Sequence, residues 1–273
     1  MIRDASVQEL SRVRALLARA NDAPYDLVKV AEEKCFGDGF EGRPAARVFG
    51  DFEGIAVTCG KHLRILAVDP AHRGRGVGTE LLRDAESRGA IVIAAEPGNY
   101  FTPGVSEAVA GFLRKRGYVE TARTQTLLCH SEPPQDGEES PSRRGSFAVY
   151  AAQDDTTRAA VLHFIEKNFG AIWRFEAGKG STIFAIEDEG EIAGFATHDA
   201  NNKGLGFFGP TGIADSHRHR GLGRQLLLAS LADLRRLGYD RAVIPWTDAI
   251  EFYRKACGAR IDHRFVILRR KSA

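Results

Sequence analysis

The chain contains the same arginine- and glycine-rich segment twice. The first copy lies in LRILAVDPAHRGRGVGTELL and the second in GPTGIADSHRHRGLGRQLL. Three residue pairs match at one constant spacing: Arg73 with Arg218, Gly76 with Gly221, and Gly78 with Gly223. Further along the chain, GFLRKRGY matches EFYRKACGA, with Phe112 aligned to Phe252. A repeat of such a long period indicates two duplicated domains rather than a solenoid.

A polar segment separates the two copies. Residues 131–146 read SEPPQDGEESPSRRGS, which lacks any large apolar side chain and cannot bury enough surface to offset the entropy lost on ordering. We therefore predict a solvated linker at 131–146, between a first domain at 1–130 and a second domain at 147–273. A chain of 273 residues, of which 43% are apolar, is long enough for two such cores.

Both halves show one order of predicted elements. A short strand, an amphipathic helix, a pair of strands and a further strand lead into the glycine-rich segment, and a helix follows it. The apolar face of that helix is formed in the two copies by Val77, Leu81 and Ala85, and by Leu227, Leu231 and Leu234. Another strand, a helix and a last strand (TQTLLC or FVILRR) are expected to close each half. This order predicts a mixed α/β (α+β) fold in each half, with a largely antiparallel sheet flanked by helices.

Composition argues against several classes of protein. The 38 Lys and Arg residues against 36 Asp and Glu leave a net charge of +2, which argues against a dedicated nucleic-acid binder. No apolar run of about 18 residues is present, so we expect no membrane span, and the acidic residues near the start predict no signal peptide. The four cysteines lie far apart without a Cys-x-x-Cys pair, so we expect no metal site, no disulfide framework and a cytoplasmic location.

The glycine-rich segments predict an anion site in each half. Glycines allow a tight turn and the close approach of a ligand to the backbone, and the amides at the start of the next helix have no partner within that helix. Together these features form a pocket for a phosphate or pyrophosphate. The residues that contribute glycine or positive charge are Arg73, Gly74, Arg75, Gly76 and Gly78 in one copy, and Arg218, Arg220, Gly221 and Gly223 in the other.

Three interpretations of this anion site compete. A dinucleotide fold needs Gly-x-Gly-x-x-Gly, but Thr79 stands in place of the third glycine, and His219 stands in place of the first glycine of the second copy. A nucleotide P-loop needs Gly-Lys-Ser/Thr, and Gly180 follows Lys179 instead. The third interpretation fits both copies: Arg-x-x-Gly-x-Gly after a strand resembles motif A of the GNAT acetyltransferase superfamily. FYRKACGA is also similar to a later helix of that superfamily, and the tandem arrangement resembles that of mycothiol synthase.

This resemblance covers most of both halves and implies that both bind acetyl-CoA. The two loops would hold its pyrophosphate, and the strands before them would pair with its pantetheine arm. The residues implied to contact the coenzyme in the first half are Ala67, Val68, Arg73, Gly74, Arg75, Gly76, Val77, Gly78 and Thr79. Those implied in the second half are Ile213, Ala214, Arg218, His219, Arg220, Gly221, Leu222, Gly223 and Arg224.

The resemblance also implies direct attack of an amine on the thioester, with a tyrosine of the later helix as general acid. Tyr253 occupies that position in the second half, whereas the first half has Leu113. The second domain is therefore predicted to be catalytic, and the first to bind without turnover or to use another acid such as Tyr100. Asp248, beside the start of the helix, is our candidate general base, with His198 and Glu187 as alternatives.

We expect an N-acetyltransferase that acts on a primary amine of a small molecule or peptide. One alternative is a catalytically silent acyl-CoA-binding or regulatory protein, and another is a nucleotide-dependent enzyme. The sequence leaves open the identity of the acceptor and whether the chain is a monomer or a homodimer, and it predicts neither a nucleic-acid nor a membrane partner.

Overall fold

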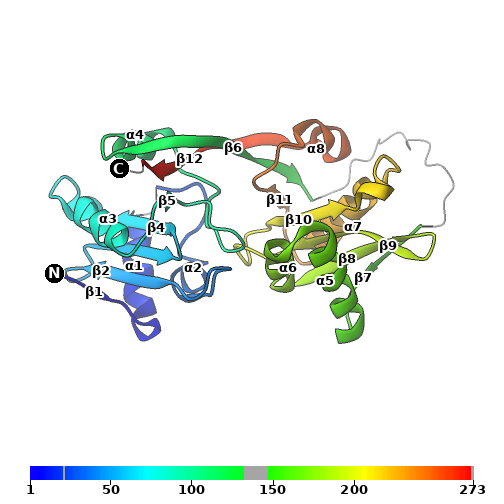
Figure 1. Cartoon of the computed structure of the whole chain (residues 1–273), viewed down its shortest axis with the longest axis horizontal. Coiled ribbons are helices and arrows are strands. Elements are labelled where there is room, and N and C mark those ends of the chain that lie inside the picture. The colour runs from blue at the N-terminus through cyan, green and yellow to red at the C-terminus, as the bar shows by residue number, and fades with distance from the viewer. Residues whose placement is uncertain (21, 132–146, 272–273) are drawn as a thin grey trace. The chain divides into compact units, whose positions relative to one another are not determined.

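The computed structural model of the protein describes residues 1–20, 22–131 and 147–271. The chain divides into two compact units (Figure 1). Unit 1 comprises residues 1–124 and 263–273, and unit 2 comprises residues 125–262. The predicted linker at 131–146 lies outside the described residues except for its first residue, Ser131, which is buried.

Unit 1 begins with a short strand and two helices and continues with the repeat described above. Its elements are β1 (Ile2–Asp4), α1 (Leu10–Ala20), α2 (Ala31–Phe36), β2 (Ala45–Phe49), β3 (Gly54–Cys59), β4 (His62–Val68), α3 (Val77–Ser87), β5 (Val92–Ile93), α4 (Glu107–Arg114), the first part of β6 (Tyr118–His130) and most of β12 (Arg260–Arg270). Short 3-10 turns, Val7–Glu9 and Pro70–His72, precede α1 and α3.

Unit 2 repeats this order with a longer first helix. Its elements are β7 (Phe147–Ala151), α5 (Asp155–Phe169), α6 (Ala171–Gly178), β8 (Thr182–Asp188), β9 (Glu191–His198), β10 (Phe208–Ile213), α7 (Leu222–Arg236), β11 (Arg241–Ile244), α8 (Ile250–Cys257) and the last part of β6. A 3-10 turn, Asp215–His217, precedes α7.

The sheets confirm the predicted mixed α/β architecture. In unit 1 the strand order is β1-β2-β3-β4-β5-β12-β6, and β4 and β5 run parallel because α3 connects them as a crossover. The neighbouring pairs β1–β2, β2–β3, β3–β4 and β5–β12 are antiparallel. In unit 2 the order β10-β9-β8-β7 is antiparallel throughout.

The later part of the last strand of each repeat belongs to the other unit, which corrects the expectation that each half is closed by its own strand. The end of β6, from Leu127 to His130, pairs with β11 in unit 2. The end of β12 pairs with β5 in unit 1 and lies beside β6 (Figure 1), so that Leu268 faces Ile93. Leu127 and Leu268 are buried where these strand ends pair, because Leu127 joins the core around α7 and Leu268 joins the core around α3.

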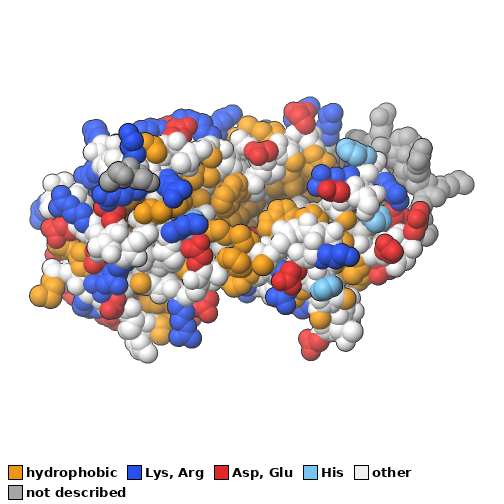
Figure 2. All heavy atoms as spheres, viewed as in Figure 1, with side chains coloured by type: hydrophobic (Ala, Val, Ile, Leu, Met, Phe, Trp, Pro, Cys, Tyr) orange, Lys and Arg blue, Asp and Glu red, His pale blue; other side chains and the backbone are white. Residues whose placement is uncertain are grey.

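Helices cover both faces of each sheet. Every residue of β3 is buried, although successive side chains of a strand point to opposite faces. The predicted apolar faces of the central helices are confirmed, since all six of their residues are buried: Val77, Leu81 and Ala85 of α3, and Leu227, Leu231 and Leu234 of α7. Figure 2 shows basic and acidic side chains interspersed on the visible surface, in keeping with the small net charge. None of the helices in the described ranges is long and apolar enough to cross a bilayer.

Candidate functional site

The first glycine-rich loop connects β4 to α3. It leaves the strand through the 3-10 turn Pro70–His72, after which Arg73 folds back and its Nε donates a hydrogen bond to the carbonyl of Val68 at 3.1 Å. Gly76 is the N-cap of α3 and has φ +90°. The space around a Cβ at Gly76 is open, so its left-handed backbone, rather than crowding, is what favours glycine there.

This loop presents a row of unpaired backbone amides. The amides of Thr79 and Glu80 donate to the carbonyl of Gly76, but across the described ranges no group accepts from the five amides between Gly74 and Gly78. Residues 74–76 are exposed, so their amides can be reached from solvent. Amides at the start of a helix, together with the positive end of the helix dipole, are typical of a phosphate-binding site.

The second loop has the same geometry. Arg218 Nε donates to the carbonyl of Ile213 at 3.5 Å, five residues back along the chain as in the first loop. Gly221 has φ +82° and is the N-cap of α7. His219 has φ +63° at the position where the first copy has Gly74. In the part of the chain that the structure describes, the amides of residues 219–223 also lack an acceptor.

In unit 1 the strands β4 and β5 separate just before this loop. Their pairing consists of two residue pairs and ends at Leu63 and Ile93. Ala94 and Ala95 then have φ of +53° and +51°, an uncommon conformation for residues with a side chain, and turn the chain away from β4. Within the described ranges, residues 65–68 therefore have no strand partner on the β5 side, which leaves an edge to which an extended ligand can bind.

Unit 2 opens in the same way. β10 is an edge strand of its sheet, and among the described residues its pairing toward β11 is limited to a parallel bridge between Val243 and Phe207, the residue just before β10. β11 ends at Ile244, and Trp246 then has φ +49°. Residues 211–214, which include the predicted coenzyme contacts Ile213 and Ala214, are thus unpaired on the side that faces β11.

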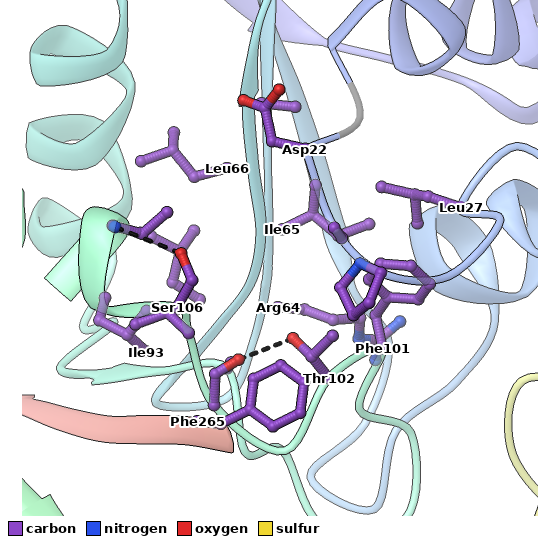
Figure 3. A pocket seen from close by; sticks show the side chains of 18 of the residues that line it. Asp22, Leu27, Arg64, Ile65, Leu66, Ile93, Phe101, Thr102, Ser106 and Phe265 are labelled. Atoms are coloured by element: carbon purple, nitrogen blue, oxygen red, sulfur yellow. Dashed lines mark hydrogen bonds between the residues drawn. The ribbon is translucent and has the colours of Figure 1, made fainter. Parts of the chain in front are cut away.

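A cavity of about 190 Å³ lies at the opening between β4 and β5 of unit 1 (Figure 3). It is lined by the end of α1 and the loop that follows, by residues 63–67 of β4, by the start of α4 and by Phe265 of β12. Leu113, which replaces the tyrosine expected on the later helix, lines this cavity and is itself buried. The sequence motif thus marks the loop, whereas the cavity beside it is formed by segments far apart in the sequence.

Tyr253 lies on α8 within the core of unit 2. Its ring makes edge-to-face contacts with Phe208 and Phe252, with centroid distances of 6.2 and 4.9 Å. Only 6% of the residue is exposed, and burial raises the pKa of the phenol. A Cβ built on Gly223 would lie 3.6 Å from Phe252 Cζ, which places α8 against the start of α7 and hence beside the second loop.

The three candidate bases have different surroundings. Asp248 is exposed and precedes the start of α8. His198 is fully buried, and its Nε2 lies 2.9 Å from a carboxylate oxygen of Asp233, so it is enclosed in the core. Glu187 accepts a hydrogen bond from the phenol of Tyr150 at 2.8 Å. Of the three, Asp248 is the most exposed, whereas Glu187 is partly buried and His198 is enclosed.

The sequence did not reveal a buried polar network beside the cavity of unit 1. Arg64 of β4 donates two hydrogen bonds to Glu96, at 2.5 and 2.7 Å, and neither side chain is exposed. Lys34 Nζ donates to Asn99 Oδ1 at 2.9 Å in the same region. A signal was present, since Arg64 interrupts an otherwise apolar strand, and a charge in such a position needs a partner.

Two family models match the sequence and together cover more than half of the chain. The acetyltransferase (GNAT) domain model matches residues 28–120, and the acetyltransferase (GNAT) family model matches residues 145–259. No curated protein matches the sequence.

Solved structures of low sequence identity share the fold of the whole chain. A GCN5-related glucosamine N-acetyltransferase region of a fungal multi-domain GH3 β-N-acetylglucosaminidase matches with a TM-score of 0.76 at 16% identity, over 98% of this chain and 38% of that chain. This chain therefore spans well under half of that protein. A GCN5-related N-acetyltransferase from Sphaerobacter thermophilus matches at 0.68 and 18% identity, over 99% and 95% of the two chains. A tandem GNAT protein from the clavulanic acid biosynthesis pathway matches at 0.69 and 15%, over 98% and 97%.

Proposed function

Because the chain belongs to the GNAT acetyltransferase family, we propose that unit 2 transfers an acetyl group from acetyl-CoA to a primary amine. Acyl transfer is the chemistry that the family and fold support in general, and the amine acceptor and the residues that act on it are the content of this proposal. The acceptor is a small molecule or a peptide terminus.

The proposal depends on one observation. A row of backbone amides that have no acceptor among the described residues occurs twice, each time after a strand with one unpaired edge. Residues 74–78 and 219–223 supply the amides, and residues 65–68 and 211–214 supply the open strand edges. Coenzyme A has an anionic diphosphate joined to an extended amide-containing arm. A helix start that binds anions, next to an unpaired strand edge, complements both parts.

The proposed contacts follow this complementarity. The diphosphate binds the loop amides, with Arg75 and Arg220 as nearby cations. Arg220 Nη1 already donates to Asp188 at 2.7 Å, which orders its side chain beside the second loop. The pantetheine arm lies along the open edge, at Ala67 and Val68 in unit 1 and at Ile213 and Ala214 in unit 2.

The proposed reaction in unit 2 needs no covalent enzyme intermediate. The amine nitrogen attacks the thioester carbonyl, and its surplus proton passes to Asp248. The tetrahedral intermediate then collapses, the C–S bond breaks, and the thiolate of CoA takes a proton from the hydroxyl of Tyr253. The raised pKa keeps that phenol protonated at neutral pH, as a general acid requires.

The experiment is a turnover assay with acetyl-CoA and a panel of primary amines. Release of the CoA thiol is measured, and the acetylated product is identified by its mass in mass spectrometry. We expect acetylation of at least one amine and calorimetric binding of CoA. Binding without turnover of any amine would instead favour a silent acyl-CoA-binding protein. Stabilisation by NAD or ATP but not by CoA would contradict the coenzyme assignment.

A further inference from the structure

The cavity of unit 1 reaches both faces of the sheet. Five consecutive residues of β4, from Leu63 to Ala67, line it. Leu66 packs with the core around α3 and α4, and because successive side chains of a strand alternate, Ile65 and Ala67 point to the opposite face. The cavity therefore passes through the gap between β4 and β5 instead of ending at the sheet.

One end of this cavity adjoins the glycine-rich loop. Asp22 lines that end, and its carboxylate forms an ion pair with Arg73, the first residue of the loop, at 2.8 Å. Figure 3 shows Thr102 and Phe265 at the end opposite Asp22. A coenzyme whose diphosphate lies at the loop would thus direct its thioester end toward Phe265.

The polar side chains of the cavity wall are already paired. Asp22 and Arg64 are the ionisable lining residues among those the structure describes. The carboxylate of Asp22 binds Arg73, and the side chain of Arg64 is wholly buried in its pair with Glu96. Thr102 Oγ1 donates to the carbonyl of Gly104 at 2.7 Å.

The remaining wall is apolar. It consists mainly of aliphatic and aromatic side chains that include Ile65, Ile93, Phe101, Val105 and Phe265. A charged amine would find no unpaired carboxylate there, so its ammonium group would lose hydration without compensation. An aliphatic chain has no charge whose hydration would be lost, and its transfer from water into an apolar cavity is favourable.

We propose that unit 1 holds an acyl-CoA whose acyl group is an aliphatic chain longer than acetyl, with the pantetheine arm along the open edge of β4 and the acyl chain in the end of the cavity beside Thr102 and Phe265. The inference rests on the proposed binding of coenzyme A at residues 73–78. Leu113 provides no proton for a leaving thiolate at the position where unit 2 has Tyr253, so unit 1 retains this ligand without transferring its acyl group.

The test is a calorimetric titration of the full chain carrying Gly221→Asp, which blocks the loop of unit 2. The ligands are CoA and its acetyl, butyryl, hexanoyl and octanoyl thioesters. We expect Kd to fall by about fourfold for each added methylene until the cavity is filled, since each buried methylene contributes a constant increment. Equal affinity for all four thioesters would overturn the inference, whereas absence of binding even for free CoA would contradict the proposed coenzyme site itself.

Two substitutions at the end of the cavity far from the loop test whether the acyl chain lies there. Thr102→Trp fills the far end of the cavity, and we expect this variant to bind hexanoyl-CoA no more tightly than acetyl-CoA. Phe265→Leu widens the cavity, and we expect the rise in affinity to continue to a longer chain. Neither residue belongs to the loop, so the affinity for free CoA serves as the internal control for folding. An unchanged dependence on chain length in both variants would place the acyl group elsewhere.

Discussion

Gly76 and Gly221 hold the same left-handed conformation, with φ of +90° and +82°, at the residue before α3 and α7. In each loop the carbonyl of this glycine accepts from amides of the first helical turn, whereas the amides just before them have no acceptor among the described residues. The two repeats have diverged around this glycine, but they keep the backbone geometry that an anion site requires.

Replacement of Gly221 by Asp is expected to abolish coenzyme binding in unit 2. The new side chain adds bulk and negative charge where the diphosphate would lie. Gly238 is a matched control, because it also has a positive φ, of +90°, and open space around a Cβ, but lies after the C-terminal end of α7, at the opposite end of that helix from the loop. Both variants lose similar stability, and a calorimetric titration should lose one CoA site in Gly221→Asp alone. Two equal sites in that variant would contradict the assignment.

Replacement of His219 by Gly is expected to stabilise unit 2. His219 has φ +63°, a conformation that costs a residue with a side chain about 1 kcal/mol. Glycine avoids this strain but loses more backbone entropy on folding, so part of the gain in stability is cancelled. A rise in melting temperature would be the sign of relieved strain. The control is His217→Gly, in the preceding 3-10 turn, where no positive φ occurs and glycine should destabilise. Equal shifts in the two variants would argue against strain at His219.

Replacement of Tyr253 by Phe is expected to lower kcat about 100-fold or more, because a general acid is lost. The affinity for acetyl-CoA should persist, since the ring and its contacts with Phe208 and Phe252 remain. Tyr239→Phe removes another phenol of unit 2, one that donates to Asp199, and serves as the control with near-normal kcat. Unchanged turnover in Tyr253→Phe would rule out the role.

The pH dependence of kcat provides an independent check on Tyr253. Burial raises the pKa of this phenol above the ordinary value of 10.0. A general acid must be protonated, so activity that depends on it is retained below the raised pKa and lost only as the pH rises through it. We expect no alkaline decline of kcat from this group below a pH of about 10. A decline in wild-type kcat below that pH that disappears in Tyr253→Phe would show that the phenol titrates too early.

Replacement of Glu96 by Gln is expected to destabilise unit 1 by about 3–5 kcal/mol, because the guanidinium of Arg64 loses its charged partner inside the protein. The double variant Arg64→Met with Glu96→Leu should recover part of this loss, since neither member of the pair is then left as an unpaired buried charge. Glu9→Gln removes the partner of Arg3 at the surface and should change the melting temperature little. Thermal unfolding followed by circular dichroism measures all three, and equal effects of Glu96→Gln and Glu9→Gln would refute the argument.

The sequence by itself determined the duplication, the mixed α/β order and the position of both glycine-rich loops. These features depend on neighbours along the chain: the alternation of apolar residues, the glycines at positive φ and the unpaired amides that follow from the start of a helix. The same local logic predicted the buried faces of α3 and α7, including Leu81 and Leu231.

Only the tertiary structure decided which strand completes which sheet and where a ligand could lie. TQTLLC and FVILRR both predict strands, and no local pattern shows which of them pairs with β5 and which with β11. Pairing placed Leu127 beside Ile244 in unit 2 and Leu268 beside Ile93 in unit 1. The same long-range packing enclosed Tyr253, joined Arg64 to Glu96 and opened the cavity beside Leu113, because burial and strand separation depend on segments that meet only in the folded chain.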